Sequence, residues 1–285
     1  MECQFFIQSE ATVKLASLLS GNEQSEQIII FLHGGPGSGY APLRKIPAFK
    51  ELEKQYLCFY FDQRSSGNSL YPTHVKMTKK ELVDDVIQMI SYVKKKFPKK
   101  QLYLFGGSFG GSLALHTIQQ FSDDIQGLIL SCPAVFFDNT TGEEFFRNML
   151  HTHIQTTKLL FTSDDFDSIL DLPAKDFFNH PQIKKYIYSK ENQSTSTRYT
   201  AQISDWFFTD HLAGVFASCT IPMCIIQGKN DPICFEQAID NQVKLEKNAL
   251  ISYHALDSCG HAPFEDQPQI FLDIIHKFIQ EGTKC

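Results

Sequence analysis

The stretch QLYLFGGSFGG, residues 101–111, decides the fold of this 285-residue chain. Its first part, residues 101–106, is an apolar run typical of a buried parallel strand. A helical pattern follows almost at once, so Ser108 must occupy a sharp strand-to-helix turn. Gly106 and Gly110 flank that turn, where the helix packs back against the strand and leaves no room for side chains. The stretch therefore predicts one strand and one helix of a layered α/β domain.

The alternation of strand-like and helix-like segments continues on both sides of this stretch. Runs of Ile, Leu and Phe indicate strands covered on both faces, and Thr78 with Glu81 forms a capping-box signal for one helix. This alternation predicts an α/β fold with a doubly wound, mostly parallel sheet. The predicted strands are residues 12–19, 27–33, 56–62, 101–106, 127–131, 221–227 and 250–255, and the predicted helices are residues 78–97, 110–121, 235–246 and 268–279.

The pattern changes between residues 134 and 219. This block lacks strong strand signals and is predicted to form several short helices, among them residues 143–160 and 204–216. Residues 1–133 and 220–285 together are predicted to form the core, and both ends of the block return to the same edge of its sheet. This arrangement favours an inserted helical lid over a separate domain.

Ser108 needs a partner, because a neutral hydroxyl is a poor nucleophile until a base takes its proton. An acid and a histidine follow it in the chain order that suits a serine on such a turn. Asp231 comes directly after the predicted strand 221–227, and His261 follows the predicted strand 250–255. Because the carboxyl ends of parallel strands share one edge of an open sheet, we expect the three side chains to meet there. His261 would transfer the proton, and Asp231 would orient its imidazole.

Other residues compete for these two roles. Asp257 lies close to His261 and Asp240 follows Asp231, but neither occupies the first turn after a strand. Histidines elsewhere in the chain are more often surface or structural residues, namely His33, His116, His151, His153, His180, His211 and His254. Position after a strand therefore favours Asp231 and His261.

Attack on a carbonyl creates an oxyanion, which two preorganised N–H donors stabilise. The sequence HGGPG, residues 33–37, follows the predicted strand 27–33, and its glycines let a backbone N–H turn inward. We assign the two donors to Gly35 in this loop and to Phe109 after the nucleophile. His33 is expected to hold the loop through hydrogen bonds. The loop lacks the spacing and the lysine of a phosphate-binding loop.

Together these motifs resemble the proline iminopeptidase branch of the α/β-hydrolase superfamily. The matching pieces are HGGPG at 33–37, DQRSSGNS at 62–69, GGSFGG at 106–111, DWFFTDHL at 205–212, GKND at 228–231 and GH at 260–261. The resemblance implies the α/β-hydrolase fold. It also implies a serine aminopeptidase that removes an N-terminal residue, often proline, from short peptides without a metal or cofactor.

The chain departs from this family where a substrate amine should bind. Members hold the amine with lid carboxylates and with a Glu after the catalytic Asp, and that position is Pro232 in this chain. A buried ammonium without a carboxylate partner is costly. Either Glu143, Glu144 or Asp205 supplies the partner, or the substrate has no free amine. The alternative function is therefore a carboxylesterase or lactonase acting on a small ester, and a third hypothesis is a non-catalytic binding protein on the same fold.

Composition limits the partners. The net charge is −6, and no sustained basic face offers a site for nucleic acid. No apolar run approaches the roughly 20 residues that span a bilayer, and the N-terminal residues lack the pattern of a secretory signal. Several of the eight cysteines lie in strand-like apolar runs, which is typical of reduced thiols and favours the cytoplasm. We expect a small-molecule or short-peptide substrate, with no cofactor, metal, nucleic-acid or membrane partner.

Overall fold

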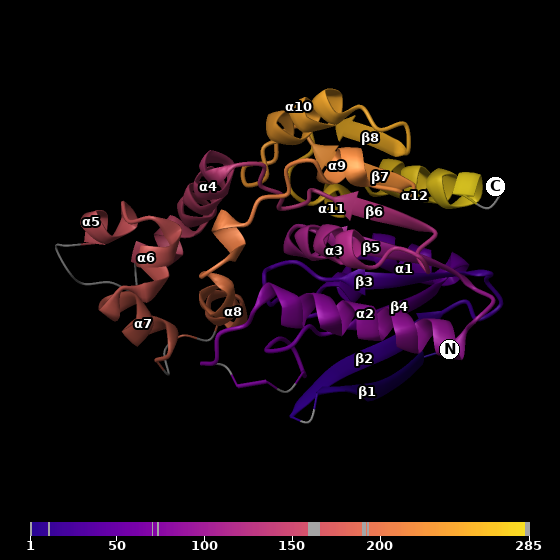
Figure 1. The fold of residues 1–285 in the computed structure, drawn as a ribbon, viewed down its shortest axis with the longest axis horizontal. Coiled ribbons are helices and arrows are strands. Elements are labelled where there is room, and N and C mark those ends of the chain that lie inside the picture. The colour runs from indigo at the N-terminus through magenta and orange to yellow at the C-terminus, as the bar shows by residue number, and fades with distance from the viewer. Residues whose placement is uncertain are drawn as a thin grey trace.

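The computed structural model describes residues 2–10, 12–69, 71–72, 74–158, 166–189, 192 and 194–282. Within these ranges the chain forms an eight-stranded sheet in the order β1-β2-β4-β3-β5-β6-β7-β8 (Figure 1). β2 pairs antiparallel with β1 and β4, and all other pairs are parallel. The predicted doubly wound, mostly parallel sheet is confirmed. The strands are β1 Glu2–Glu10, β2 Val13–Gly21, β3 Gln27–Leu32, β4 Leu57–Phe61, β5 Gln101–Gly107, β6 Gly127–Ser131, β7 Met223–Gly228 and β8 Ile251–Leu256.

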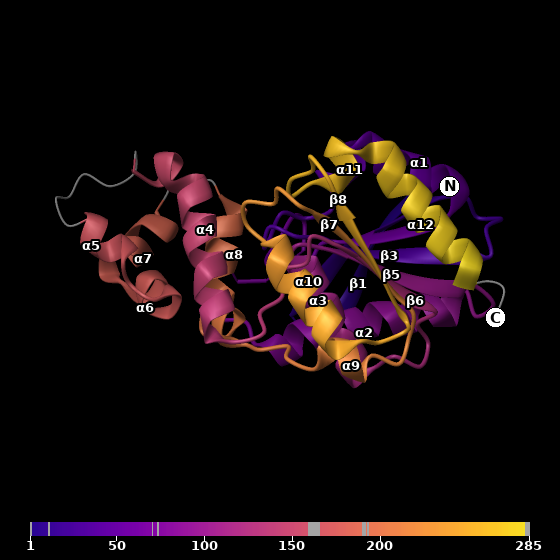
Figure 2. The ribbon, with the colours of Figure 1, turned by 90° about the horizontal axis from the view of Figure 1, so that it is seen from above.

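Helices cover both faces of the sheet, with α1, α11 and α12 on one face and α2, α3 and α10 on the other (Figure 2). Side chains of β3 alternate between two apolar clusters, so that Ile28 and Ile30 join one, whereas Ile29 and Phe31 join the other. A strand buried on both faces needs this unbroken apolar run. The helices of the core are η1 Leu43–Lys45, α1 Pro47–Gln55, α2 Lys79–Lys96, α3 Phe109–Gln120, α10 Glu236–Glu246, α11 Pro263–Asp266 and α12 Pro268–Gly282.

The predicted capping box at the start of α2 is confirmed. The Thr78 hydroxyl accepts a hydrogen bond from the Glu81 N–H at 3.2 Å, and the Glu81 carboxylate accepts one from the Thr78 N–H at 2.7 Å. Strand β1 was not predicted. It lies at the edge of the sheet, and its side chains are mostly exposed apart from buried Ile7. Its sequence, ECQFFIQSE, lacks the long apolar run that marks the strands buried on both faces, such as β3 and β4.

The predicted helix over residues 204–216 is wrong. The chain there forms a short 3₁₀ turn, becomes extended at Asp210, and reaches the left-handed region at Gly214, where φ is 77°. The Asp210 carboxylate lies 2.8 Å from the Lys79 ammonium and 3.0 Å from His116 Nε2. These contacts with α2 and α3 hold the segment in an irregular path and override its local helical preference.

Helices occupy the stretch between β6 and β7. Figure 1 shows α4 to α8 at one end of the sheet, whereas α9 lies next to α10, and Figure 2 shows α5, α6 and α7 farthest from the sheet. They are α4 Asn139–Lys158, α5 Phe166–Leu170, α6 Ala174–Asn179, α7 Pro181–Ile187, α8 Thr195–Ile203, η2 Phe207–Thr209 and α9 Val215–Ser218. The last two residues of the predicted helix 143–160 lie outside the described residues. Among the described helices, none combines the length and the apolar character needed to cross a membrane.

The loop after β3 is held by His33, whose side chain is fully buried. Its Nδ1–H donates to the Gly34 carbonyl at 3.0 Å, and its Nε2 accepts from the Gln63 N–H at 3.0 Å. A neutral imidazole satisfies both contacts, whereas a cation would lose the second. Burial lowers the pKa of His33 to about 4. His33 therefore has the structural role that the sequence analysis expects.

This burial predicts a pH-dependent stability. The unfolded chain takes up a proton at His33 near pH 6.5, whereas the native chain resists it until about pH 4. The free energy of unfolding should fall as the pH falls through this window, by on the order of 3 kcal/mol. His33→Gln should remove this part of the slope in denaturant titrations at several pH values. The matched change at exposed His211 should keep the wild-type slope, and an unchanged slope in His33→Gln would contradict the assignment.

A second prediction concerns the contact between α3 and β3. A Cβ at Gly110 would overlap the Leu32 carbonyl oxygen, whereas a Cβ at Gly107 would meet nothing closer than 3.7 Å. Gly110→Ala should therefore destabilise the fold by about 2 kcal/mol or more, despite the better helix propensity of alanine. Gly107→Ala should melt close to the wild type. Thermal unfolding measures both variants, and equal melting temperatures would show that α3 can move away from β3.

Candidate active site

Ser108 stands between β5 and α3 in a backbone conformation that serine rarely adopts, with φ 51° and ψ −122°. Its N–H donates to the Ser131 carbonyl at 3.0 Å, and its own carbonyl accepts from the Ala134 N–H at 3.0 Å. These bonds tie the turn to the carboxyl end of β6. The surrounding sheet thereby maintains a strained conformation that would relax in an isolated peptide.

The loop of residues 33–37 lies directly against this turn. A Cβ at Gly34 would come 3.1 Å from the Ser108 Cβ and 2.9 Å from the Gly107 carbonyl oxygen. Gly35 has φ 119°, a value that side-chain-bearing residues rarely adopt. The two backbone segments can therefore approach as closely as glycine allows, which brings the loop beside the Ser108 side chain.

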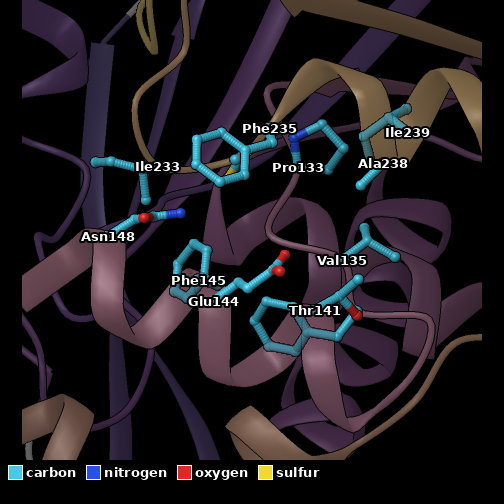
Figure 3. Close-up of a pocket in the computed structure, with 12 residues that line it drawn as sticks. Pro133, Val135, Thr141, Glu144, Phe145, Asn148, Ile233, Phe235, Ala238 and Ile239 are labelled. Carbon is cyan, nitrogen blue, oxygen red and sulfur yellow. The ribbon is translucent and has the colours of Figure 1, made fainter. Parts of the chain in front are cut away.

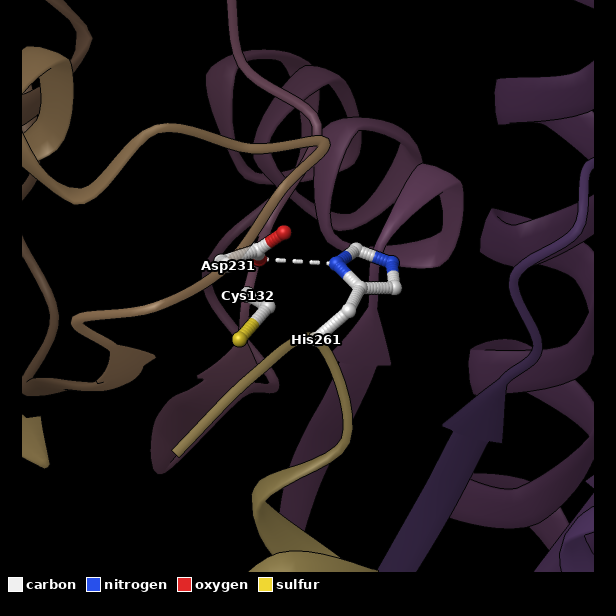
Figure 4. A group of neighbouring side chains, drawn as sticks. All are labelled: Cys132, Asp231 and His261. Carbon is white, nitrogen blue, oxygen red and sulfur yellow. Dashed lines mark hydrogen bonds and ion pairs between the residues drawn. The ribbon is translucent and has the colours of Figure 1, made fainter. Parts of the chain in front are cut away.

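His261 and Asp231 form a hydrogen-bonded pair, with 2.7 Å between His261 Nδ1 and Asp231 Oδ2 (Figure 4). The other carboxylate oxygen accepts from the N–H groups of Ile233 and Cys234 at 2.9 and 3.0 Å. Burial acts to raise the pKa of Asp231, but the bonds from His261 and the two backbone N–H groups outweigh it and leave the pKa lowered. Asp231 is therefore ionised at neutral pH and held in a fixed orientation toward the imidazole.

Ser108 and His261 line one cavity of about 300 Å³ at the carboxyl ends of the parallel strands. Gly35 also lines this cavity. Phe109 is the first residue of α3, so its N–H has no acceptor within the helix and points out of the helix start. The structure thus brings the predicted nucleophile, base and loop donor to one space, with Asp231 behind His261.

The rival acids lie elsewhere. The Asp257 side chain is 85% exposed and pairs with Lys229 at 2.8 Å. Asp240 pairs with Lys244 one turn along α10. Neither carboxylate is hydrogen-bonded to His261, which leaves Asp231 as the imidazole's partner among the described residues.

The three acids proposed for a substrate amine differ in their surroundings. The Glu143 carboxylate accepts from the Ala174 N–H at 3.2 Å, and Asp205 pairs with Lys76 at 3.1 Å. Glu144 lines a second, narrow pocket of about 30 Å³, and Figure 3 shows its carboxylate turned toward the middle of that pocket. None of the three is among the described residues that line the Ser108 cavity.

The wall of the Ser108 cavity is mostly apolar, and sequence reasoning did not identify it. Its described lining carries no charged carboxylate, ammonium or guanidinium group. The apolar residues come from separate parts of the chain between residues 32 and 264, so no local motif marks them. They are Leu32, Pro42, Leu43, Ile46, Phe105, Phe145, Met149, Ile233 and Phe264.

One group of possible metal ligands overlaps this site. The ligand atoms of Cys132, Asp231 and His261 lie within 4.8 Å of one another (Figure 4). The Asp231–His261 hydrogen bond already uses two of these atoms, and burial raises the pKa of the Cys132 thiol well above its usual value. A metal ion bound there would have to break the pair and deprotonate the thiol.

The chain is similar in sequence to a proline iminopeptidase, a putative esterase/lipase and a probable aminopeptidase. The chain is 23% identical to a proline iminopeptidase of Thermoplasma volcanium, over 91% of each chain. It is 26% identical to a putative esterase/lipase of Mycoplasma pneumoniae, over 88% of each chain. A probable aminopeptidase of Bacillus subtilis is 36% identical over 120 residues, which are 40% of this chain and 36% of that protein.

The family itself follows from a match over most of the chain. The sequence profile of the alpha/beta hydrolase fold matches residues 27–268, from β3 to the start of α12. That range contains the glycine-rich loop, Ser108, Asp231 and His261. The chain belongs to the α/β-hydrolase-fold family and is a hydrolase.

Proposed function

We propose that this chain is a serine hydrolase in which Ser108 is the nucleophile, His261 the general base and Asp231 the residue that orients it. The observation that carries the proposal is the 2.7 Å bond between His261 and a buried, ionised Asp231, with His261 and Ser108 on the same cavity. The Asp231 carboxylate fixes the Nδ1–H tautomer, so that Nε2 is the nitrogen free to accept a proton.

The proposed reaction proceeds in two steps. His261 takes the Ser108 proton as the hydroxyl oxygen bonds to the substrate carbonyl carbon, and the resulting oxyanion is held by the N–H groups of Gly35 and Phe109. The tetrahedral intermediate collapses when His261 returns the proton to the leaving group, which departs from an acyl-Ser108 ester. Water then repeats the sequence, releasing the acid and regenerating Ser108.

For the substrate, we favour the N-terminal residue of a short peptide, as in proline iminopeptidases. The motif set and the Thermoplasma volcanium relative support this choice. The cavity of about 300 Å³ suits a small acyl group, and its apolar wall suits a prolyl ring. Of the three candidate acids, Glu144 is the one that has no hydrogen-bonded or ionic partner among the described residues, so we assign it to the substrate amine.

A specific observation favours a second candidate, an esterase or lactonase. The described lining of the Ser108 cavity holds no carboxylate, and an ammonium buried there without one loses several kcal/mol. An ester with a neutral acyl group makes no such demand. The Mycoplasma pneumoniae relative supports this candidate.

We further propose that residues 134–219 form a lid over the site, because Phe145 and Met149 of α4 contribute to the cavity wall. The proposed location is the cytoplasm, where thiols such as Cys58 and Cys224, which lie free and buried in the core, stay reduced. Neither a metal nor a cofactor is needed for the proposed chemistry.

Ser108→Ala tests the reaction class. Loss of the nucleophile should lower kcat by about 10⁶-fold on any substrate that the wild type cleaves, and should abolish labelling by a fluorophosphonate. Circular dichroism would confirm that the variant is folded. Undiminished turnover in Ser108→Ala would refute the proposed mechanism.

Cleavage of an arylamide and of an ester distinguishes the aminopeptidase from the esterase. The wild type should cleave a prolyl arylamide. Glu144→Gln should raise KM for this arylamide by about 10-fold and leave KM for a p-nitrophenyl ester unchanged, because the arylamide is the substrate that carries an ammonium. Glu143→Gln is the matched control, since that carboxylate is engaged with the Ala174 N–H. Rapid ester cleavage without arylamide cleavage would decide for the esterase.

A further inference from the structure

Helix α8 belongs to the inserted block, yet it contacts both segments that carry the proposed oxyanion donors. Tyr199 is its central contact and is fully buried. The Tyr199 hydroxyl donates to Gln63 Oε1 at 2.9 Å, which links the inserted block to the loop after β4. A hydroxyl buried at this depth loses its solvation, so this bond constrains the position of both side chains.

Gln63 is also hydrogen-bonded to His33, the first residue of the glycine-rich loop. Its side-chain amide donates to the His33 carbonyl at 2.9 Å, and its backbone N–H donates to His33 Nε2 at 3.0 Å. His33 is therefore held at its ring and at its backbone by one residue, two positions before Gly35. The Tyr199 bond completes this set by fixing the amide plane of Gln63.

The Tyr199 ring makes the second connection. It packs edge-on against the Phe109 ring, with 5.7 Å between ring centroids. It also fills the space beside Gly37, where an added Cβ would come 2.5 Å from the Tyr199 Cβ. Thr195, the first residue of α8, donates from its hydroxyl to the Gly37 carbonyl at 3.2 Å. One helix thus contacts the loop of Gly35 and the side chain of Phe109 together.

We propose that Tyr199 is a positioning residue for the oxyanion hole, and that α8 makes the geometry of this hole depend on the docking of the inserted block. The proposal rests on the function proposed above. Oxyanion donors act over a narrow range of distance, about 2.7–3.1 Å from the developing charge. A small shift of the loop relative to Phe109 therefore weakens transition-state binding more than substrate binding.

Tyr199→Phe tests the proposal, because it keeps the ring and removes the bond to Gln63. We expect kcat to fall by about 10- to 100-fold and KM to stay within about twofold of the wild-type value. Loss of one complete oxyanion donor lowers kcat by about 10²–10³-fold, and a displaced donor should have a smaller effect. The affinity for phenylboronic acid, which forms a tetrahedral adduct with a nucleophilic serine, should fall in parallel with kcat/KM. Tyr103→Phe is the matched control, because Tyr103 is equally buried and its hydroxyl donates to the Ile279 carbonyl at 3.3 Å, away from the cavity.

Thr195→Val provides a second test that leaves Tyr199 intact and is used alone should Tyr199→Phe not fold. It should lower kcat and boronate affinity together, by about 3- to 10-fold. The proposal is overturned if the altered variants match Tyr103→Phe in kcat and boronate affinity, or if they lose only thermal stability. Those outcomes differ from failure of the proposed function, which would appear as turnover that survives Ser108→Ala.

Discussion

The backbones of α3 and β3 touch at Gly110, and the geometry of the active edge depends on this contact. The absence of a side chain lets the start of α3 lie against the Leu32 carbonyl. The residue between β5 and α3 must then turn sharply, which places Ser108 in its strained conformation. Gly34 meets the same turn from the β3 side. A Cβ at Gly34 or Gly110 would push the β3 side and the start of α3 apart by about the size of a methyl group. That shift is larger than the range of distances over which an oxyanion donor acts.

His33 and His261 show how hydrogen-bonding partners decide the chemical role of a histidine. His33 is fully buried and accepts the Gln63 N–H at Nε2, so burial disfavours its cation despite the bond to the Gly34 carbonyl, and the residue serves as a fixed anchor. His261 faces an ionised carboxylate that three further donors hold in place, so a cation formed there during the reaction is stabilised. The same residue type thus takes a structural role beside one loop and a proton-transfer role beside another.

The parts of this protein that sequence predicts well are those set by local constraints. The strands buried on both faces are predicted by their unbroken apolar runs. Ser108 and Asp231 come at the ends of two of these strands, whereas His261 comes shortly after β8, which is only partly buried. Edge strand β1 was not predicted because one of its two faces is exposed to solvent and most of its residues are polar. The segment 204–216 was predicted wrongly because contacts of Asp210 with α2 and α3 decide its path. The cavity wall could not be predicted, since Leu43, Met149 and Phe264 meet only after folding.

Whether the substrate is a peptide or an ester depends on how the site can bind the ammonium group of a peptide substrate. In an aminoacyl substrate the amine nitrogen lies about 2.5 Å from the carbonyl carbon, so it must sit within the Ser108 cavity when that carbon is attacked. Glu144 lines the neighbouring pocket, and the side chains of Phe145 and Ile233 border both spaces. For Glu144 to reach the amine, one of these two side chains has to move aside. A peptide substrate must therefore supply the free energy for this rearrangement from its own binding, whereas a neutral ester can react in the cavity as it stands.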